Sequence, residues 1–135
     1  MAQVSKKHLP KSLEENMHGL LRQTLADLHS EQDVAEFLDD LLTPTEKVML
    51  GKRLAIAVLL DKGYDQRTIH SMMRVSVSTV NTVNYWLTNK GDGYRKVIAR
   101  IKGKQQWKNF LEKLDRALDD LYHVNMVMYP GMKKR

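Results

Sequence analysis

Apolar side chains recur every three or four residues along most of the chain, which is the spacing of one face of an α-helix. The first run extends to Leu28 and has Ser12 as its expected N-cap, and a second run follows Ser30. Five further helices are predicted at residues 46–62, 66–73, 77–88, 94–101 and 104–123. The pattern therefore predicts an all-α protein.

The clearest helix start is the sequence Thr-Pro-Thr-Glu at residues 43–46. Thr43 is predicted as the N-cap, Pro44 suits the first helical position, and Glu46 completes a capping box with Thr43. We expect this helix to stop at Gly63, because glycine is common just after a helix end. Its apolar residues cover more than one stripe, which is typical of a central helix or of one shared between two subunits.

Residues 75–87, VSVSTVNTVNYWL, look like a β-strand on composition because valine and threonine favour sheets. Apolar residues alternate only at the start of the stretch, so the period of a strand is not maintained. At 100° per residue, Val80, Val83 and Leu87 lie within about 60° of one another on one helical face. Ser76 stands where an N-cap is needed. The stretch is therefore predicted to be a helix, and Lys90 to Gly93 a loop after it.

A short helix, a three-residue turn and a second helix with small polar residues at its front form a helix-turn-helix pattern at residues 65–88. The second helix of this motif enters the DNA major groove, where small side chains let the backbone approach the bases. Phosphate contacts are predicted for Gln66, Arg67, Thr68 and Arg74, and groove contacts for Ser76, Val77, Ser78, Thr79, Asn81, Thr82 and Tyr85.

The net charge of +6 is unevenly distributed along the 135 residues. Residues 31–46 carry six acids and no base, whereas residues 90–108 carry seven bases and one acid. Such blocks are typical of a positive surface for a polyanion with an acidic surface elsewhere, although a merely solvated surface would look the same. If the partner is DNA, basic residues within 90–102 are expected to join the phosphate contacts.

Other classes of function are disfavoured. The chain has no cysteine, its five histidines are dispersed, and no motif points to a metal, a cofactor or an enzyme. We expect His70, on the first helix of the motif, to be a polar surface residue or a phosphate contact. The longest apolar run has seven residues, too few for a membrane span, and the N-terminus lacks a secretory h-region. We therefore expect a cytoplasmic protein without membrane partners.

The stretch LLTPTEKVMLGKRLAIAVLLDKGYDQRTI resembles the Trp repressor superfamily in its helix start, its Gly51-x-Arg53 pair and the glycine before the motif. STVNTVNYWL and KGDGYRKVI are most similar to a smaller, poorly characterised bacterial branch of that superfamily. The resemblance covers about residues 38–100. It implies an interlocked all-α homodimer that binds double-stranded DNA at a two-fold operator.

The resemblance also implies a possible effector pocket, because the tryptophan-dependent repressor holds its corepressor with two arginines. Arg53 matches the first arginine and Thr43 a pocket threonine, whereas the second arginine falls at Thr82. Val83 and Trp86 replace a glycine and a serine. The resemblance thus implies a shared scaffold without a response to free tryptophan, and leaves any effector unidentified. Trp86 could fill part of the pocket, or it could be an ordinary core residue.

We therefore predict an N-terminal helical arm (1–30), a Trp-repressor-like core (31–101), and a C-terminal helix with a basic tail (102–135). The predicted function is a homodimeric, sequence-specific transcriptional regulator, acting as a repressor through the helix at 77–88. The alternative is a protein-interaction or accessory module that keeps the fold without operator binding. The second helix of the motif carries no charge between residues 75 and 89, which keeps this alternative open.

Overall fold

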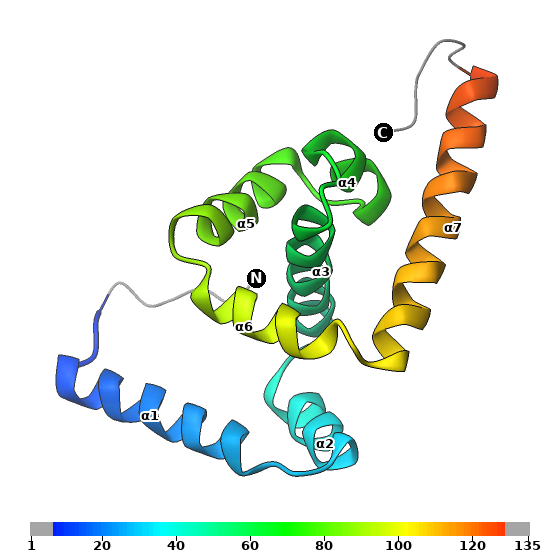
Figure 1. Ribbon diagram of the computed structural model, residues 1–135. Helices are drawn as coiled ribbons and strands as arrows, with labels where there is room; N and C mark the ends of the chain where they lie inside the picture. Colours follow the sequence, from blue (N-terminus) through cyan, green and yellow to red (C-terminus); the bar gives the residue numbers. More distant parts are fainter. Residues whose placement is uncertain (1–6, 129–135) are drawn as a thin grey trace. The chain divides into compact units, whose positions relative to one another are not determined.

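The structure is a computed structural model that describes residues 7–128, without the side chains of residue 118 and of residues 121–128. Helices joined by short turns make up this part of the chain, and no strand occurs in it (Figure 1). The all-α prediction is confirmed. The helices are α1 (Lys11–Asp27), α2 (Glu31–Leu41), α3 (Pro44–Asp61), α4 (Gln66–Met73), α5 (Val77–Asn89), α6 (Asp92–Ile101) and α7 (Gln105–Met128).

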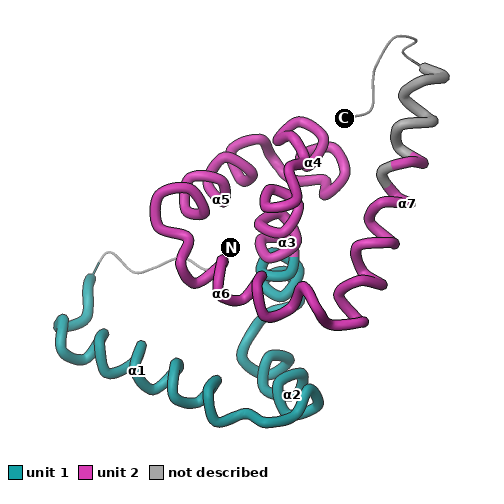
Figure 2. Tube along the Cα trace, in the orientation of Figure 1, with its two compact units in different colours: residues 1–51 teal, residues 52–135 magenta. Residues whose placement is uncertain are grey.

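The chain divides into two compact units, residues 1–51 and residues 52–135 (Figure 2). The first unit holds α1, α2 and the start of α3, and neither α1 nor α2 has a buried residue. The second unit holds the rest of α3 and the four later helices. Between residues 7 and 128, no helix combines the length and the apolar character that crossing a lipid bilayer requires.

Two of the three predicted helix starts in the first half of the chain are confirmed. The Ser30 side chain accepts a hydrogen bond from the Asp33 amide, and Thr43 and Glu46 exchange the two bonds of a capping box at 3.0 and 3.1 Å. These bonds lower the pKa of the Glu46 carboxyl. The prediction for Ser12 is wrong, because the Pro10 carbonyl already accepts the first helical bond from Glu14 (3.1 Å). Ser12 is thus a residue of α1.

The predicted end of α3 at Gly63 is confirmed. Gly63 has a φ of 94°, which a side chain would strain. Its amide donates to the Leu60 carbonyl, and the Tyr64 amide donates to the Leu59 carbonyl, both at 3.0 Å. This pair of bonds is a Schellman motif, which satisfies the last carbonyl groups of the helix. The turn directs the chain from α3 into α4.

The core of the second unit surrounds the C-terminal half of α3. Residues 55–59 of α3 are all buried, which explains why apolar residues cover more than one stripe of this helix. Ile69 of α4, Val80 and Val83 of α5, and Ile98 of α6 complete the core. The prediction that residues 77–88 form a helix is confirmed, and α5 buries Val80 and Val83 against this core.

Two predicted boundaries in the second half are wrong. Helix α6 begins at Asp92 instead of Tyr94, because the Gly91 carbonyl accepts the Arg95 amide (2.8 Å) and the Asp92 carboxylate suits a helix N-terminus. Helix α7 continues to Met128 instead of ending near His123, and no glycine or proline interrupts it. The basic tail lies outside the described residues.

Helix α7 is attached to the core by both apolar and polar contacts. Trp107, Leu111 and Leu114 pack against the core. The Tyr64 hydroxyl donates a hydrogen bond to the Asp115 carboxylate, and the Lys62 ammonium lies 3.9 Å from the same carboxylate. Burial raises the pKa of Tyr64 to about 12, and the nearby carboxylates of Asp115 and Asp119 add to this effect. The C-terminal helix is therefore tied to the turn that precedes α4.

Candidate functional site

Helices α4 and α5 and the turn between them form the predicted helix-turn-helix. Asp65 caps α4 by accepting the Thr68 amide at 2.7 Å, and Ser76 caps α5 by accepting the Thr79 amide at 3.1 Å. The cap at Ser76 is confirmed, whereas the cap at Asp65 was not expected from the sequence. The two helices pack on each other and on the core through Ile69, Val80 and Val83.

The turn is held by bonds to its backbone. Arg74 adopts the left-handed conformation with φ 52°, and its carbonyl accepts a 3.4 Å hydrogen bond from the Lys52 ammonium of α3. The carbonyl of Val75 accepts a hydrogen bond from Nδ1 of His70. His70 is half-buried, and its Nδ1 atom is already bonded within the turn. That nitrogen is therefore neither available to solvent nor free for a phosphate, contrary to the expectation. The imidazole closes the turn instead.

Helix α5 presents a broad face of small side chains to solvent. Val77 is 49% exposed and Tyr85 is 58% exposed, and Ser78, Asn81 and Thr82 between them are also exposed. The structure thus brings these five predicted groove residues together on one side of the helix. Thr79 is half-buried because it faces the core side, and Ser76 is at the cap.

The predicted phosphate contacts lie on α4 and the turn. Arg67 and Arg74 are exposed, whereas Gln66 and Thr68 in the first turn of α4 are half-buried. The long cationic side chains are therefore the accessible members of this set. Whether each predicted residue touches DNA stays a prediction.

Some basic residues after α5 have structural roles. Arg95 donates to the Leu87 carbonyl near the end of α5 and to the Asp92 carboxylate, both at 2.8 Å. The Lys102 ammonium lies 3.1 Å from Asp61. Within the described residues, Lys96 and Arg100 form no ion pair. Both are exposed, so their charges are available for the predicted phosphate contacts.

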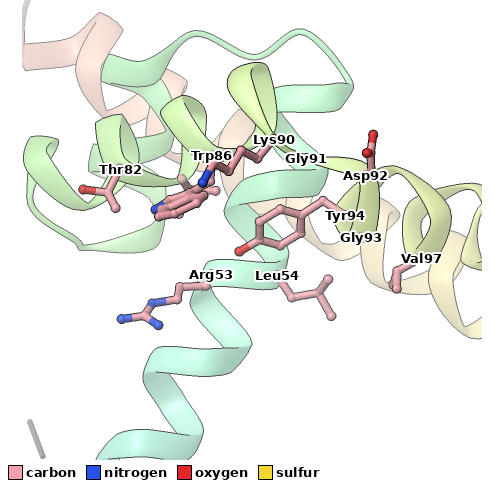
Figure 3. A pocket seen from close by; sticks show the side chains of 11 residues that line it. Arg53, Leu54, Thr82, Trp86, Lys90, Gly91, Asp92, Gly93, Tyr94 and Val97 are labelled. Atoms are coloured by element: carbon pink, nitrogen blue, oxygen red, sulfur yellow. The ribbon is translucent and has the colours of Figure 1, made fainter. Parts of the chain in front are cut away.

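A pocket of about 740 Å³ lies between α3, α5 and the start of α6 (Figure 3). Four of the five predicted effector residues line it, namely Arg53 of α3 and Thr82, Val83 and Trp86 of α5. The fifth, Thr43, belongs to the other compact unit. Residues that are distant in the sequence thus converge where the family resemblance places the effector.

Trp86 stands at the wall of this pocket rather than in the core. Its side chain is 46% exposed, and the Lys90 ammonium lies over the indole ring, 5.1 Å from its centroid. The interpretation of Trp86 as an ordinary core residue is therefore wrong. A cation near an indole face is attracted by the ring quadrupole, so Lys90 favours this placement of the ring.

Sequence reasoning missed the other half of the pocket wall. It is formed by Leu54, Lys90, Gly91, Asp92, Gly93, Tyr94 and Val97. Gly91 is buried, and a Cβ there would collide with the Leu87 carbonyl. Gly91 was the available indication in the sequence, because a glycine lets the chain pass close to the end of α5.

Comparison with known proteins agrees with this arrangement. The family model described as Trp repressor protein matches residues 16–102, which is more than half of the chain. The match includes the helix-turn-helix and the pocket, and it ends before α7 begins. No curated protein and no solved structure matches the chain.

Proposed function

The chain belongs to the Trp repressor family of DNA-binding helix-turn-helix regulators, and we propose that it is a homodimeric, sequence-specific transcriptional repressor of the cytoplasm. Helix α5 enters the major groove of double-stranded DNA, and each copy of the chain reads one half of a two-fold operator. The observation that carries this proposal is the exposed small-residue face of α5, from Val77 to Tyr85.

The contacts divide by chemistry. Ser76, Val77 and Ser78 at the front of α5, with Asn81, Thr82 and Tyr85 behind them, face the base edges. Gln66, Arg67, Thr68 and Arg74 contact phosphates and so place α5 in register on the duplex. Lys96 and Arg100 add positive charge beside the same duplex.

A second copy of the chain covers the first unit in this proposal. The apolar residues of α1 lie on one face of the helix, and all are more than 40% exposed in the single chain. They are Leu13, Met17, Leu20, Leu21 and Leu25. A large exposed apolar patch marks an interaction surface, and family members function as dimers, which supports a second copy as its partner.

The proposed repressor does not respond to free tryptophan. Thr82 supplies no charge for a carboxylate, and the indole of Trp86 occupies space at the wall of the pocket beside Arg53. Trp86 with Lys90 then holds α5 against α6 without a ligand. Calorimetry with tryptophan at concentrations up to the millimolar range should show no binding, and tight binding would contradict this part of the proposal.

The test of DNA recognition is selection from random-sequence duplexes with the full chain, at two salt concentrations. We expect enrichment of a palindromic site, with affinity that falls as salt rises because bound cations displace counterions from the phosphates. Binding that is weak, blind to sequence and lost at the higher salt would contradict the proposal.

One observation favours a second candidate function, an accessory or protein-interaction module without operator binding. No residue from 75 to 89 is charged, so α5 itself adds no electrostatic attraction to DNA. A module of this kind would enrich no site at either salt concentration while remaining folded and dimeric.

A further inference from the structure

We propose that α5 selects A·T base pairs, with the Asn81 amide bonded to an adenine and Val77 packed against a thymine methyl in each half-site. This inference rests on the proposed function and deepens it by naming the class of DNA sequence that is read. It follows from which side chains α5 exposes and which of their polar groups are already bonded.

Val77 and Asn81 lie on the same side of α5, one turn apart, and Tyr85 follows one turn later. Val77 is 49% exposed and Asn81 is exposed, so both point away from the core that buries Val80 and Val83. Both also belong to the N-terminal half of the helix, which is the part that meets base edges in this motif.

Most of the polar groups on this side of α5 are used within the helix. The Thr82 hydroxyl donates to the Ser78 carbonyl at 2.8 Å. The Ser76 hydroxyl caps the helix and lies 3.0 Å from the Ser78 hydroxyl and 2.8 Å from the Thr79 hydroxyl. In the described chain, the Asn81 amide makes no hydrogen bond. Asn81 is therefore a side-chain amide at the front of the helix with both its donor and its acceptor available.

The chemistry of the major groove then limits what α5 can read. Guanine is most often recognised by a bidentate Arg or Lys, and cytosine by an acidic acceptor. No such residue occurs between 75 and 89. An asparagine amide pairs with N6 and N7 of adenine, and an apolar side chain contacts the thymine methyl. The exposed groups of α5 thus fit A·T pairs and lack the usual partners for G·C pairs.

The cations that the duplex requires lie outside α5. Arg67 on α4 and Arg74 on the turn are exposed, and Lys96 and Arg100 on α6 form no ion pair in the described residues. Charge complementarity with phosphates is therefore supplied beside the reading face, while the face itself stays neutral. Exposed cations beside an uncharged face of α5 fit duplex DNA, whose phosphates bind the cations while Asn81 and Val77 contact the bases.

The experiment uses the full chain and the operator obtained from random-sequence selection. Single adenines in a half-site are replaced by 7-deazaadenine, which lacks the N7 acceptor, and single thymines by uracil, which lacks the methyl group. At one adenine per half-site we expect the affinity to fall roughly five- to a hundredfold, the range for a bidentate base contact. At a neighbouring thymine we expect a smaller fall.

Two variants connect these losses to the named residues. Asn81→Ala should weaken binding to the natural operator by a similar factor and be insensitive to 7-deazaadenine at the critical position. Val77→Ala should be largely insensitive to uracil at the critical thymine. Asn89→Ala is the matched control, because Asn89 is exposed at the far end of α5 and its amide donates to the Tyr85 carbonyl (2.9 Å). It should bind as the parent protein does.

The outcomes separate this inference from the function on which it rests. If no site is enriched, both the repressor function and the A·T reading fail. If a palindrome is enriched but its essential positions are G·C pairs, or if Asn81→Ala stays sensitive to 7-deazaadenine, the A·T reading fails and the repressor function stands. Unchanged affinity of Asn81→Ala would also overturn the reading.

Discussion

At the scale of single residues, the small polar side chains at the start of α5 look alike in the sequence but have different hydrogen-bonding roles. Ser76 caps the helix, Thr82 bonds back to the helix backbone, and Asn81 keeps its amide available. The spacing of the valines predicted which side faces solvent. It could not predict which hydroxyl is already bonded, because that depends on the rotamer chosen after packing.

Introducing a negative charge at the reading face should abolish site binding and leave the fold intact. Ser78 is exposed in the first turn of α5, so Ser78→Glu costs no core packing and places a carboxylate against the phosphates and base edges. Asn81→Asp should act in the same way. Gel-shift titration measures the loss, and circular dichroism checks the helices. Unchanged affinity in both variants would mean that another face of the protein meets DNA.

Arg74 allows charge and backbone conformation to be tested separately. A residue with a Cβ atom loses about 1–2 kcal/mol of stability when its φ is held at 52°, and Arg74→Gly removes this strain. Glycine has greater conformational freedom in the unfolded chain, which offsets about 0.5–1 kcal/mol of the stability gained by removing the strain. The variant should therefore be as stable as the parent protein or slightly more stable. Urea denaturation provides the measurement.

The same substitution should weaken DNA binding by removing a phosphate contact. The slope of log K against log salt should fall by about one for each subunit. Arg74→Ala is the matched variant, because it loses the same charge but keeps the strained backbone. It should show the same salt slope and a lower stability than Arg74→Gly. An unchanged salt slope in both variants would show that Arg74 does not contact a phosphate.

At the scale of elements, α7 is the part of the second unit that the family match does not cover. The Tyr64–Asp115 hydrogen bond ties it to the turn between α3 and α4, and Trp107, Leu111 and Leu114 pack against the core. Apolar spacing predicted a helix at residues 104–123 with one apolar face. It did not predict the tie to Tyr64, because the two partners are 51 residues apart and no local pattern encodes such a pairing.

We expect Tyr64→Phe to lower the free energy of unfolding by about 1 kcal/mol at neutral pH, because Asp115 loses its donor. The raised pKa of Tyr64, about 12 against 10 when unfolded, means that the bond contributes fully below about pH 10. Its contribution should disappear as the pH rises toward 12. Denaturation of both proteins at pH 7 and pH 11 should therefore show a smaller difference at the higher pH.

Tyr94→Phe is the control for this prediction. Tyr94 is also half-buried in the second unit, but its hydroxyl makes no hydrogen bond among the described residues. Its removal should change the stability little at either pH. A difference for Tyr64→Phe that stays constant from pH 7 to pH 11 would contradict the raised pKa of Tyr64.

At the scale of the whole molecule, the first unit has too little interior of its own. Helices α1 and α2 bury no residue, and Leu20 is 67% exposed. A 17-residue helix gains most of its stability from packing rather than from propensity. A second copy of the chain is the proposed source of that packing.

Leu20→Lys should therefore shift the protein from dimer to monomer in sedimentation equilibrium at micromolar concentration. The ammonium would be buried without a partner in the dimer, whereas in a monomer it would be solvated. Ala26→Lys adds the same charge on the opposite face of α1, where the residue is also exposed, and should leave the dimer intact. A parent protein that sediments as a monomer would contradict the proposed dimer.

The sequence by itself determined what is encoded within a few residues. The helices, the caps at Ser30, Thr43 and Ser76, and the end at Gly63 follow from spacing and from side chains that bond to nearby backbone groups. The neutral face of α5 also follows from composition alone. These features were predictable because their hydrogen bonds span no more than five positions of the chain.

The tertiary structure decided what depends on distant segments meeting. It placed Arg53 and Trp86 at the wall of one pocket, and it joined Tyr64 to Asp115. Each outcome depends on how α3 to α7 pack, and packing selects one rotamer and one backbone conformation from several that the sequence allows.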